Sequence, residues 1–235
     1  MESLNNLLNE WNIVLSDYQI DQFKKYYELL IEWNSFMNLT SITDKNEVIL
    51  KHFADSIALF RYLNLSDESL IDVGTGAGFP GIPLKIVCPK LKVTLVDSLN
   101  KRVNFLNEVI GCLNLEDIFT VHSRAEDLAH NDVYREKFDY CVPRAVANLS
   151  TLSELCLPFV KTGGYFIPYK SEKTSEEISA ARNAIAILGG KLDKVEEYYL
   201  PNTDMLRTLV FISKKKSSPK KYPRKAGTPT RDPIL

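Results

Sequence analysis

The residues with the clearest chemical potential lie in one glycine-rich stretch, residues 70–81. A short apolar run that contains Asp72 is followed by four glycines within eight positions. Glycine tolerates backbone angles and close approaches that a Cβ would forbid. The stretch therefore predicts a strand that turns sharply into a helix, with exposed N–H groups at the helix start. Such a turn at the carboxyl end of a first parallel strand is typical of a site for a nucleotide-type ligand.

Two registers of this stretch predict different ligands. Gly76-x-Gly78-x-x-Gly81 satisfies the dinucleotide pattern of NAD(P)-dependent oxidoreductases, although that pattern alone is a weak indication. The register Asp72-x-Gly74-x-Gly76-x-Gly78 adds a carboxylate two residues before the first glycine. A pyrophosphate gains nothing from a nearby carboxylate, whereas the ammonium and sulfonium groups of S-adenosylmethionine do. We therefore expect S-adenosylmethionine as the cofactor, with a NAD(P)-dependent oxidoreductase as the alternative.

Polar residues also end or follow the later predicted strands. Asp97 ends the strand at 93–96, roughly 20 residues after Gly74, where doubly wound folds place a carboxylate that accepts hydrogen bonds from ribose hydroxyls. The alternative for Asp97 is a cap on the following helix. The other residues are Ala125 and Glu126 after residues 118–122, Arg144 after residues 138–142, and Lys170 after residues 165–169. Ligands bind along this edge of a parallel sheet, so we expect both cations to face substrate, with an ordinary surface charge as the alternative for Lys170.

From residue 70 onward, apolar runs of strand length alternate with helical patterns, which predicts a Rossmann-like α/β fold. We expect a mostly parallel, seven-stranded sheet whose last two strands, within residues 192–212, form an antiparallel pair. Before residue 70 the periodicity is helical, and Ser16 and Asp44 each open a capping pattern. The predicted divisions are a helical segment at 1–65, a methyltransferase core at 66–213 and a tail at 214–235.

The composition of the 235-residue chain, 45% hydrophobic, allows one well-buried core. No apolar run approaches the ~18 residues of a membrane span, and the first residues lack the basic and apolar regions of a signal peptide. The four cysteines are widely spaced in apolar segments without a C-x-x-C pair, which favours reduced, buried thiols. We therefore expect a cytoplasmic protein with no metal and no membrane partner.

Basic residues are concentrated at the end of the chain. Residues 214–235 hold eight lysines and arginines and one acidic residue, so the rest of the chain is acidic within a formal net charge of −1. Four prolines and repulsion between like charges favour an extended, mobile segment. Such a segment either solubilises the protein or neutralises phosphates on a nucleic acid, with Tyr222 and Arg224 stacking on bases. In either case, deleting it from residue 217 onward should leave cofactor affinity intact.

His52, Asp55 and Ser56 share one face of a predicted helix. Their residue types match a hydrolase triad. Three neighbours on one helix cannot easily form a linear relay, however, and the chain has no G-x-S-x-G nucleophile motif. We expect instead a polar face near a ligand or local hydrogen bonding.

Several stretches together resemble the ribosomal RNA small subunit methyltransferase G family, once called glucose-inhibited division protein B. They are Trp33-Asn34-x-x-x-Asn38-Leu39-Thr40, His52-x-x-Asp55-Ser56, Asp72-Val-Gly-Thr-Gly-Ala-Gly-Phe-Pro-Gly-Ile-Pro83, Asp97-Ser-x-x-Lys101-Arg102, Arg144-Ala145 and the Lys/Pro-rich tail. They cover nearly the full length, and the extended glycine motif is far more specific than a generic cofactor loop. Pro143 departs from the family pattern, which has a small residue before the arginine.

The resemblance implies S-adenosylmethionine-dependent methylation of a guanine N7 in 16S ribosomal RNA, either free, in the small ribosomal subunit or in an assembly intermediate. N7 carries an in-plane lone pair, so we expect no general base, and Arg144 and Lys170 are the candidates for positioning the base. The resemblance carries cofactor roles onto Gly74, Phe79, Ala125, Glu126 and Arg144, beside Asp72, Gly76, Gly78 and Asp97 from the pattern above. The expected RNA-binding residues are Lys101, Arg102, Lys220, Lys221, Arg224 and Lys225. A non-catalytic ribosome-binding protein with the same fold is a further alternative.

Overall fold

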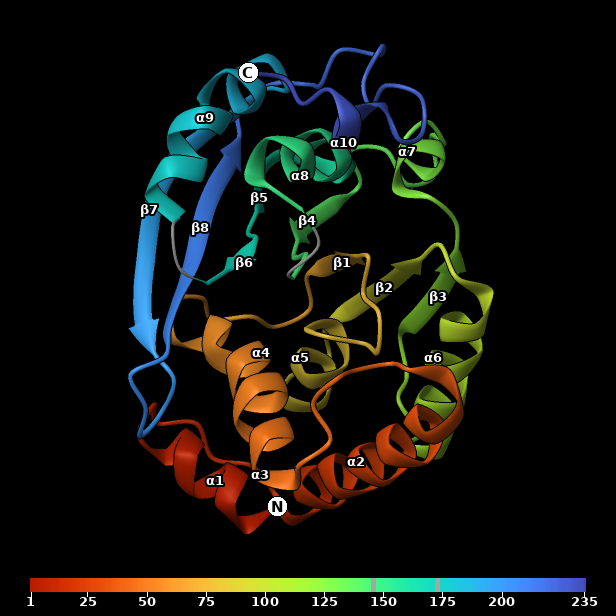
Figure 1. Ribbon diagram of the computed structural model, residues 1–235, viewed down its shortest axis with the longest axis vertical. Coiled ribbons are helices and arrows are strands. Elements are labelled where there is room, and N and C mark those ends of the chain that lie inside the picture. Colours follow the sequence, from red (N-terminus) through yellow and green to blue (C-terminus); the bar gives the residue numbers. More distant parts are fainter. Residues whose placement is uncertain (145–146, 172–173) are drawn as a thin grey trace.

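One mixed sheet organises the chain. A computed structural model describes residues 1–144, 147–171 and 174–235 (Figure 1). Ala145, which belongs to one of the motifs above, lies outside the described residues. Within them, eight strands form the sheet in the order β3-β2-β1-β4-β5-β8-β6, with β7 paired to β8. The strands are β1 (Ser69–Val73), β2 (Lys92–Asp97), β3 (Ile118–His122), β4 (Phe138–Cys141), β5 (Val160–Phe166), β6 (Tyr169–Lys170), β7 (Gly190–Tyr199) and β8 (Leu206–Lys214).

Strands β1 to β5 are parallel, and β8 runs antiparallel to β5, β6 and β7. This arrangement confirms the predicted parallel sheet with an antiparallel final pair. The sheet has one strand more than the seven expected, because the predicted strand at 165–169 is divided into β5 and β6. Pro168 lies in the division, and proline cannot donate an N–H to a strand ladder.

Helices cover both faces of the sheet, as Figure 1 shows. The N-terminal helices, α5 and α6 share one apolar core with the sheet. Apolar side chains from α7 to α9 and from the C-terminal residues form a second core on the opposite face. These elements are α5 (Gly81–Val87), α6 (Asn100–Cys112), α7 (Ala125–Leu128), α8 (Leu149–Cys156), η3 (Leu157–Phe159), α9 (Thr174–Ile187) and α10 (Thr228–Arg231).

The N-terminal segment is helical, as its periodicity predicts. Ser16 caps α2 and forms a capping box with Gln19, and Asn38 ends the same helix in the left-handed conformation. Asp44 caps α3. The chain then passes through a π-helical turn and a 3-10 turn instead of one regular helix. The elements are α1 (Glu2–Asn9), α2 (Asp17–Met37), α3 (Lys45–Val48), η1 (Ile49–Ala54, π-helical), α4 (Asp55–Ile57) and η2 (Ala58–Arg61, 3-10).

The C-terminal residues are packed onto the core, in contrast to the extended, mobile tail expected from their charge. Lys214 is buried, and its ammonium group lies 3.3 Å from the carboxylate of Glu136. The Arg224 guanidinium lies 2.8 Å from the carboxylate of Glu154, which is fully buried. Tyr222 is also buried. The repulsion within the tail is therefore offset by acidic partners that lie elsewhere in the sequence.

Candidate active site

The carboxylate of Asp72, in β1, shapes the glycine loop from beneath. Its Oδ2 atom accepts hydrogen bonds from the Thr75 hydroxyl at 2.7 Å and from the Gly81 amide at 2.9 Å. These bonds tie the start of the loop to the start of α5. Asp72 is fully buried. It thus braces the loop, which differs from the expectation that its charge faces the cationic groups of a ligand.

Helix α2 holds the other side of the loop. The Tyr26 hydroxyl donates a hydrogen bond of 2.5 Å to the carbonyl of Ala77. Gly78 follows with φ of +97°, and a Cβ there would lie 2.6 Å from Ile82 and 2.7 Å from the Tyr26 hydroxyl. Only glycine fits this position without displacing its neighbours. The helical segment and the loop are therefore built against each other.

Burial raises the pKa of Asp72 from its ordinary value of 3.8 to about 7, although the Thr75 and Gly81 hydrogen bonds and the nearby Arg144 favour the charged form. The second carboxylate oxygen, Oδ1, has no hydrogen-bond partner among the residues that the structure describes. A buried carboxylate with one unsatisfied oxygen costs less when it is protonated.

We expect the free energy of unfolding to fall as the pH rises through the titration of Asp72. The folded-state pKa lies above the unfolded value, so between these values the folded protein holds a proton that the unfolded chain has released. The stabilisation is present at the acidic end and is lost as the pH reaches about 7. Urea unfolding should show that wild type loses roughly 2 kcal/mol relative to Asp72→Asn between pH ~5 and pH ~8. A difference independent of pH would contradict this.

Asp97 lies at the end of β2 beside the loop. Its Oδ2 atom accepts a hydrogen bond from the Gly76 amide at 3.0 Å and lies 3.4 Å from the Arg102 guanidinium. Its Oδ1 atom accepts from the Leu99 amide at 2.9 Å, directly before α6. The carboxylate therefore supports the helix start and also stands at the strand end where a ribose is expected.

Gly74 lines two cavities. The larger, about 810 Å³, is also lined by Gly76 and Phe79 of the loop. The smaller, about 140 Å³, is lined by Asp97, Ala125 and Glu126, the last two at the start of α7. S-adenosylmethionine has an adenosine part and an amino-acid part. A glycine loop that reaches both cavities through Gly74, with Asp97 lining the smaller one, fits such a ligand.

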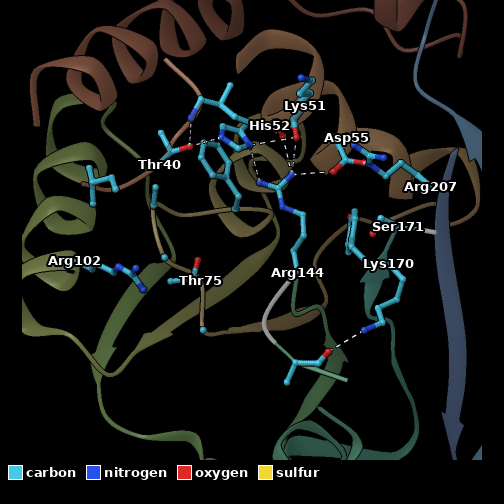
Figure 2. A pocket seen from close by; sticks show the side chains of 18 of the residues that line it. Thr40, Lys51, His52, Asp55, Thr75, Arg102, Arg144, Lys170, Ser171 and Arg207 are labelled. Carbon is cyan, nitrogen blue, oxygen red and sulfur yellow. Dashed lines mark hydrogen bonds and ion pairs between the residues drawn. The ribbon is translucent and has the colours of Figure 1, made fainter. Parts of the chain in front are cut away.

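Arg144, three residues after the end of β4, lies between the glycine loop and the N-terminal segment and lines the larger cavity (Figure 2). Its Nη1 atom donates a hydrogen bond to the carboxylate of Asp55 at 3.1 Å. The same nitrogen lies 3.3 Å from the backbone carbonyls of Lys51 and His52. Its guanidinium carbon lies 5.0 Å from the ring centre of Phe79. One arginine thus links η1 and α4 to the loop.

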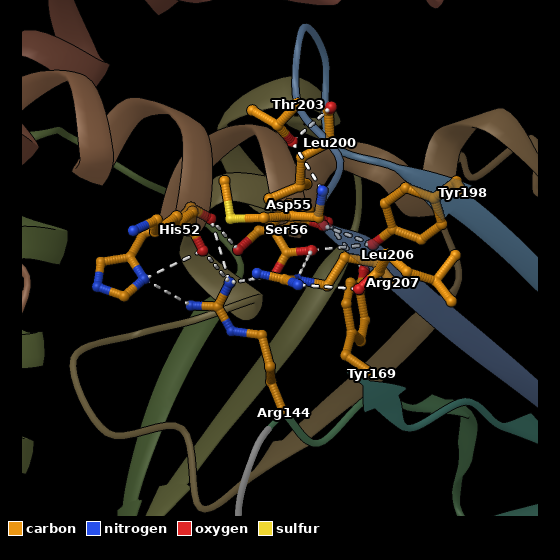
Figure 3. A network of polar contacts seen from close by, with 12 residues as sticks. His52, Asp55, Ser56, Arg144, Tyr169, Tyr198, Leu200, Thr203, Leu206 and Arg207 are labelled. Carbon is orange, nitrogen blue, oxygen red and sulfur yellow. Dashed lines mark hydrogen bonds and ion pairs between the residues drawn. The ribbon is translucent and has the colours of Figure 1, made fainter. Parts of the chain in front are cut away.

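Asp55 forms the centre of a buried polar network (Figure 3). Its carboxylate accepts a hydrogen bond from the Tyr198 hydroxyl at 3.0 Å and pairs with Arg144 at 3.1 Å and with Arg207 at 3.5 Å. Arg207 comes from β8 and lines the larger cavity. Arg207 is not among the predicted site residues, because no local motif marks it. Only the place of β8 inside the sheet brings it to the site.

His52 is held by ring stacking and by a polar contact, and it does not form a hydrolase triad. Its ring lies 4.6 Å from the Phe79 ring, and its Nε2 atom lies 2.9 Å from the Thr40 hydroxyl. Burial and the charge of Arg144 lower the pKa of His52 to about 3, so the ring is neutral at neutral pH. The Ser56 hydroxyl donates to the backbone carbonyl of His52. The polar face is therefore one of local hydrogen bonds near a cavity.

Lys170 lines the larger cavity, but its charge already has a partner. Its ammonium group lies 2.5 Å from the Glu177 carboxylate and donates to the carbonyl of Ala147 at 2.9 Å. Pro143, the departure from the family pattern, still accepts a hydrogen bond from the Tyr169 amide at 3.0 Å. The strand end that carries Arg144 is therefore paired on its carbonyl side despite the proline.

The residues predicted to bind RNA fall into two groups. The exposed ones are Lys101, Lys220, Lys221 and Lys225. Arg102 instead pairs with Asp97 and lines the larger cavity. Arg224 is held by Glu154, and Tyr222 is buried, so neither is placed to stack on a base.

A family model described as GidB, rRNA small subunit methyltransferase G, matches residues 19–205. The chain belongs to this family. The ribosomal RNA small subunit methyltransferase G of Lachnoclostridium phytofermentans is 57% identical to it, over 94% of this chain and 92% of that protein. The family's protein from Staphylococcus carnosus is 53% identical, over 100% of this chain and 99% of its own length.

Solved structures share the fold of this member of the methyltransferase G family. A SAM-dependent methyltransferase from Aquifex aeolicus has a TM-score of 0.54 at 19% identity, over 72% of this chain and 94% of that one. M. jannaschii TYW2 in complex with AdoMet has a TM-score of 0.56 at 16% identity, over 74% and 79%. The antiparallel β8 also separates this sheet from the all-parallel order of dinucleotide-binding folds. Family and topology thus decide against the NAD(P) alternative.

Across residues 1–144, 147–171 and 174–235, no cluster of three or more His, Cys, Asp or Glu side chains is arranged to hold a metal ion. No helix in these same ranges has the length and apolar character needed to cross a membrane.

Proposed function

We propose that the protein transfers the methyl group of S-adenosylmethionine to N7 of a guanine in 16S ribosomal RNA. The observation that carries this proposal is that the glycine loop, Asp97 and Arg144 line two cavities that share Gly74, in a member of the methyltransferase G family. The choice of guanine N7 rests on the family resemblance. An RNA substrate of this kind implies a cytoplasmic enzyme.

The residues present would hold the cofactor in two parts. Asp97 would accept hydrogen bonds from the ribose hydroxyls, and Ala125 and Glu126 line the cavity proposed for the adenine. The loop from Gly74 to Phe79 lines the cavity expected for the amino-acid part. When bound, the cofactor supplies a methyl group on a positively charged sulfur, which is open to attack by a nitrogen lone pair.

The protein's own contribution to the chemistry is positioning. Guanine N7 needs no base to remove a proton, which agrees with a neutral, half-buried His52. Holding the reacting atoms in line can supply about 7–11 kcal/mol of the barrier. Arg144 lines the larger cavity and would donate to guanine O6, a contact that arginine makes well. Asp55 positions Arg144, and Lys170 is the second candidate, restrained by its pairing with Glu177.

Exposed lysines provide a surface for the RNA backbone. Lys101 lies on α6 next to Arg102, which lines the larger cavity. Three further lysines lie on the packed tail: Lys220, Lys221 and Lys225. Phosphate contacts of this kind contribute affinity and set orientation without reading sequence. We therefore propose that the tail binds RNA as an ordered segment.

The deciding experiment follows labelled methyl groups from S-adenosylmethionine into deproteinised 16S RNA and into small ribosomal subunits, with the product nucleotide mapped by mass spectrometry. We expect label on a guanine N7 in at least one substrate. Calorimetry with S-adenosylhomocysteine on the same preparation separates the failures. No binding at millimolar ligand would overturn the proposal, while binding without transfer to either substrate would favour a non-catalytic ribosome-binding protein.

Replacing Asp97 with alanine should weaken S-adenosylhomocysteine binding by about 1–3 kcal/mol, the cost of leaving buried ribose hydroxyls unpaired. Calorimetry of the folded variant measures this change. Asp193→Ala is a matched control, because Asp193 lies on β7 and its carboxylate is 3.9 Å from Lys215, away from both cavities. Equal affinities of the Asp97 variant and wild type would remove Asp97 from the cofactor site.

A further inference from the structure

The last residues of the chain contact both helices that line the smaller cavity. Figure 1 shows α10 beside α8 and α7, the two helices whose residues line that cavity. The backbone amide of Gly227 donates a hydrogen bond of 2.9 Å to the carboxylate of Glu126. Glu126 is separated from Gly227 by 101 positions in the sequence. The contact therefore joins the C-terminal segment to the cavity wall itself.

Helix α8 is held between the same cavity and the same segment. Leu152 and Leu155 line the cavity. On another side of the helix, the Thr151 hydroxyl donates to the carbonyl of Pro229 at 2.9 Å. Glu154 is fully buried and receives hydrogen bonds from the Arg224 guanidinium at 2.8 Å and from its backbone amide at 2.7 Å. The C-terminal segment thus fixes both helices that bound the cavity.

We infer that residues 226–235 are a structural part of the adenosine site, in which the Gly227 amide positions the Glu126 carboxylate for contact with the adenine. The inference rests on the proposed function, which assigns the smaller cavity to adenosine. It replaces the expectation that the tail can be removed without effect on the cofactor. The hydrogen bond from the Gly227 N–H restricts the rotation of the Glu126 carboxylate before the ligand arrives. The side chain therefore loses less conformational entropy when adenine binds.

The test is a chain that ends after Lys225. This truncation removes the Gly227 amide and α10 but keeps Arg224 with its partner Glu154. It removes one arginine and one aspartate, so the net charge does not change. We expect S-adenosylhomocysteine to bind about tenfold more weakly, which is the change in dissociation constant that the loss of one hydrogen bond typically causes. A chain that ends after Asp232 keeps the Gly227–Glu126 contact, and it should bind as wild type does.

The preference of the protein for adenine over other bases distinguishes a positioning role of the Gly227 amide from a general loss of structure in the truncated chain. We expect the preference for S-adenosylhomocysteine over S-inosylhomocysteine, which lacks the adenine amino group, to fall in the Lys225 truncation. In a Glu126→Gln background the same truncation should have a much smaller effect, because the two changes then act on one contact. Wild-type affinity and wild-type preference in the folded truncation would overturn the inference.

Amide hydrogen exchange on the intact protein keeps the test independent of truncation. Saturating S-adenosylhomocysteine should slow exchange across residues 226–231, because the ligand and the Gly227 amide share Glu126. Unchanged exchange would overturn the inference even if the truncated chain fails to fold. If intact protein does not bind S-adenosylhomocysteine at all, the proposed function fails instead, so the two failures are distinguishable.

Discussion

Replacing Arg144 with lysine should slow methyl transfer about a hundredfold, because a misplacement of about 1 Å in a positioning group can cost that much. Lysine keeps the charge and can reach Asp55. It cannot contact Asp55 and the carbonyls of Lys51 and His52 with one planar group, nor stack that group on Phe79. Initial rates with labelled S-adenosylmethionine and 16S RNA measure the effect.

Arg182→Lys is the matched control for Arg144→Lys. Arg182 is exposed on α9, so the same change of residue type there should leave the rate unaltered. Thermal unfolding of both variants establishes that each protein is folded. An Arg144→Lys rate within about threefold of wild type would show that the geometry of the guanidinium, beyond its charge, does not matter.

Replacing Phe53 with alanine should lower the free energy of unfolding by about 3–5 kcal/mol, the usual cost of removing a buried aromatic ring. Phe53 in η1 is fully buried. Its ring centre lies 5.0 Å from Phe23, 5.4 Å from Tyr26 and 6.0 Å from Phe79. Because Tyr26 supports the glycine loop and Phe79 belongs to it, S-adenosylhomocysteine affinity should fall as well. Urea unfolding and calorimetry measure the two effects.

The comparison for Phe53→Ala is Phe36→Ala in the same helical segment. Phe36 is 65% exposed, so its removal leaves little cavity. Its cost should stay below about 1 kcal/mol, as for most surface substitutions. Similar losses of stability in both variants would mean that the aromatic cluster around the loop is not a principal support of the fold.

The sequence was sufficient for the parts of the fold that depend on local patterns. Alternating apolar runs predicted the parallel sheet, and the capping signatures at Ser16 and Asp44 marked two helix starts that the structure confirms. The glycine spacing after Asp72 predicted a sharp turn between β1 and α5, which the structure contains. Each of these features is set by residues within a few positions of one another.

The features that differed from expectation depend on partners far away in the sequence. Arg224 suggested a free cation, but its partner Glu154 is 70 positions away. Asp72 suggested a ligand-facing charge, because only the folded loop shows that its Oδ2 atom is occupied by Thr75 and Gly81. The contacts of Asp55 with Arg207 and Tyr198 likewise exist only after the sheet has assembled.

The place of β8 within the sheet has a consequence for synthesis. This late strand lies between β5 and β7, so a nascent chain leaves the edge of β5 uncovered until residues 206–214 have emerged from the ribosomal tunnel. Arg207 arrives with the same strand, and until then Asp55 lacks one of its cationic partners. The sheet and the polar network are therefore completed by the same strand, and neither forms in full before β8 is available.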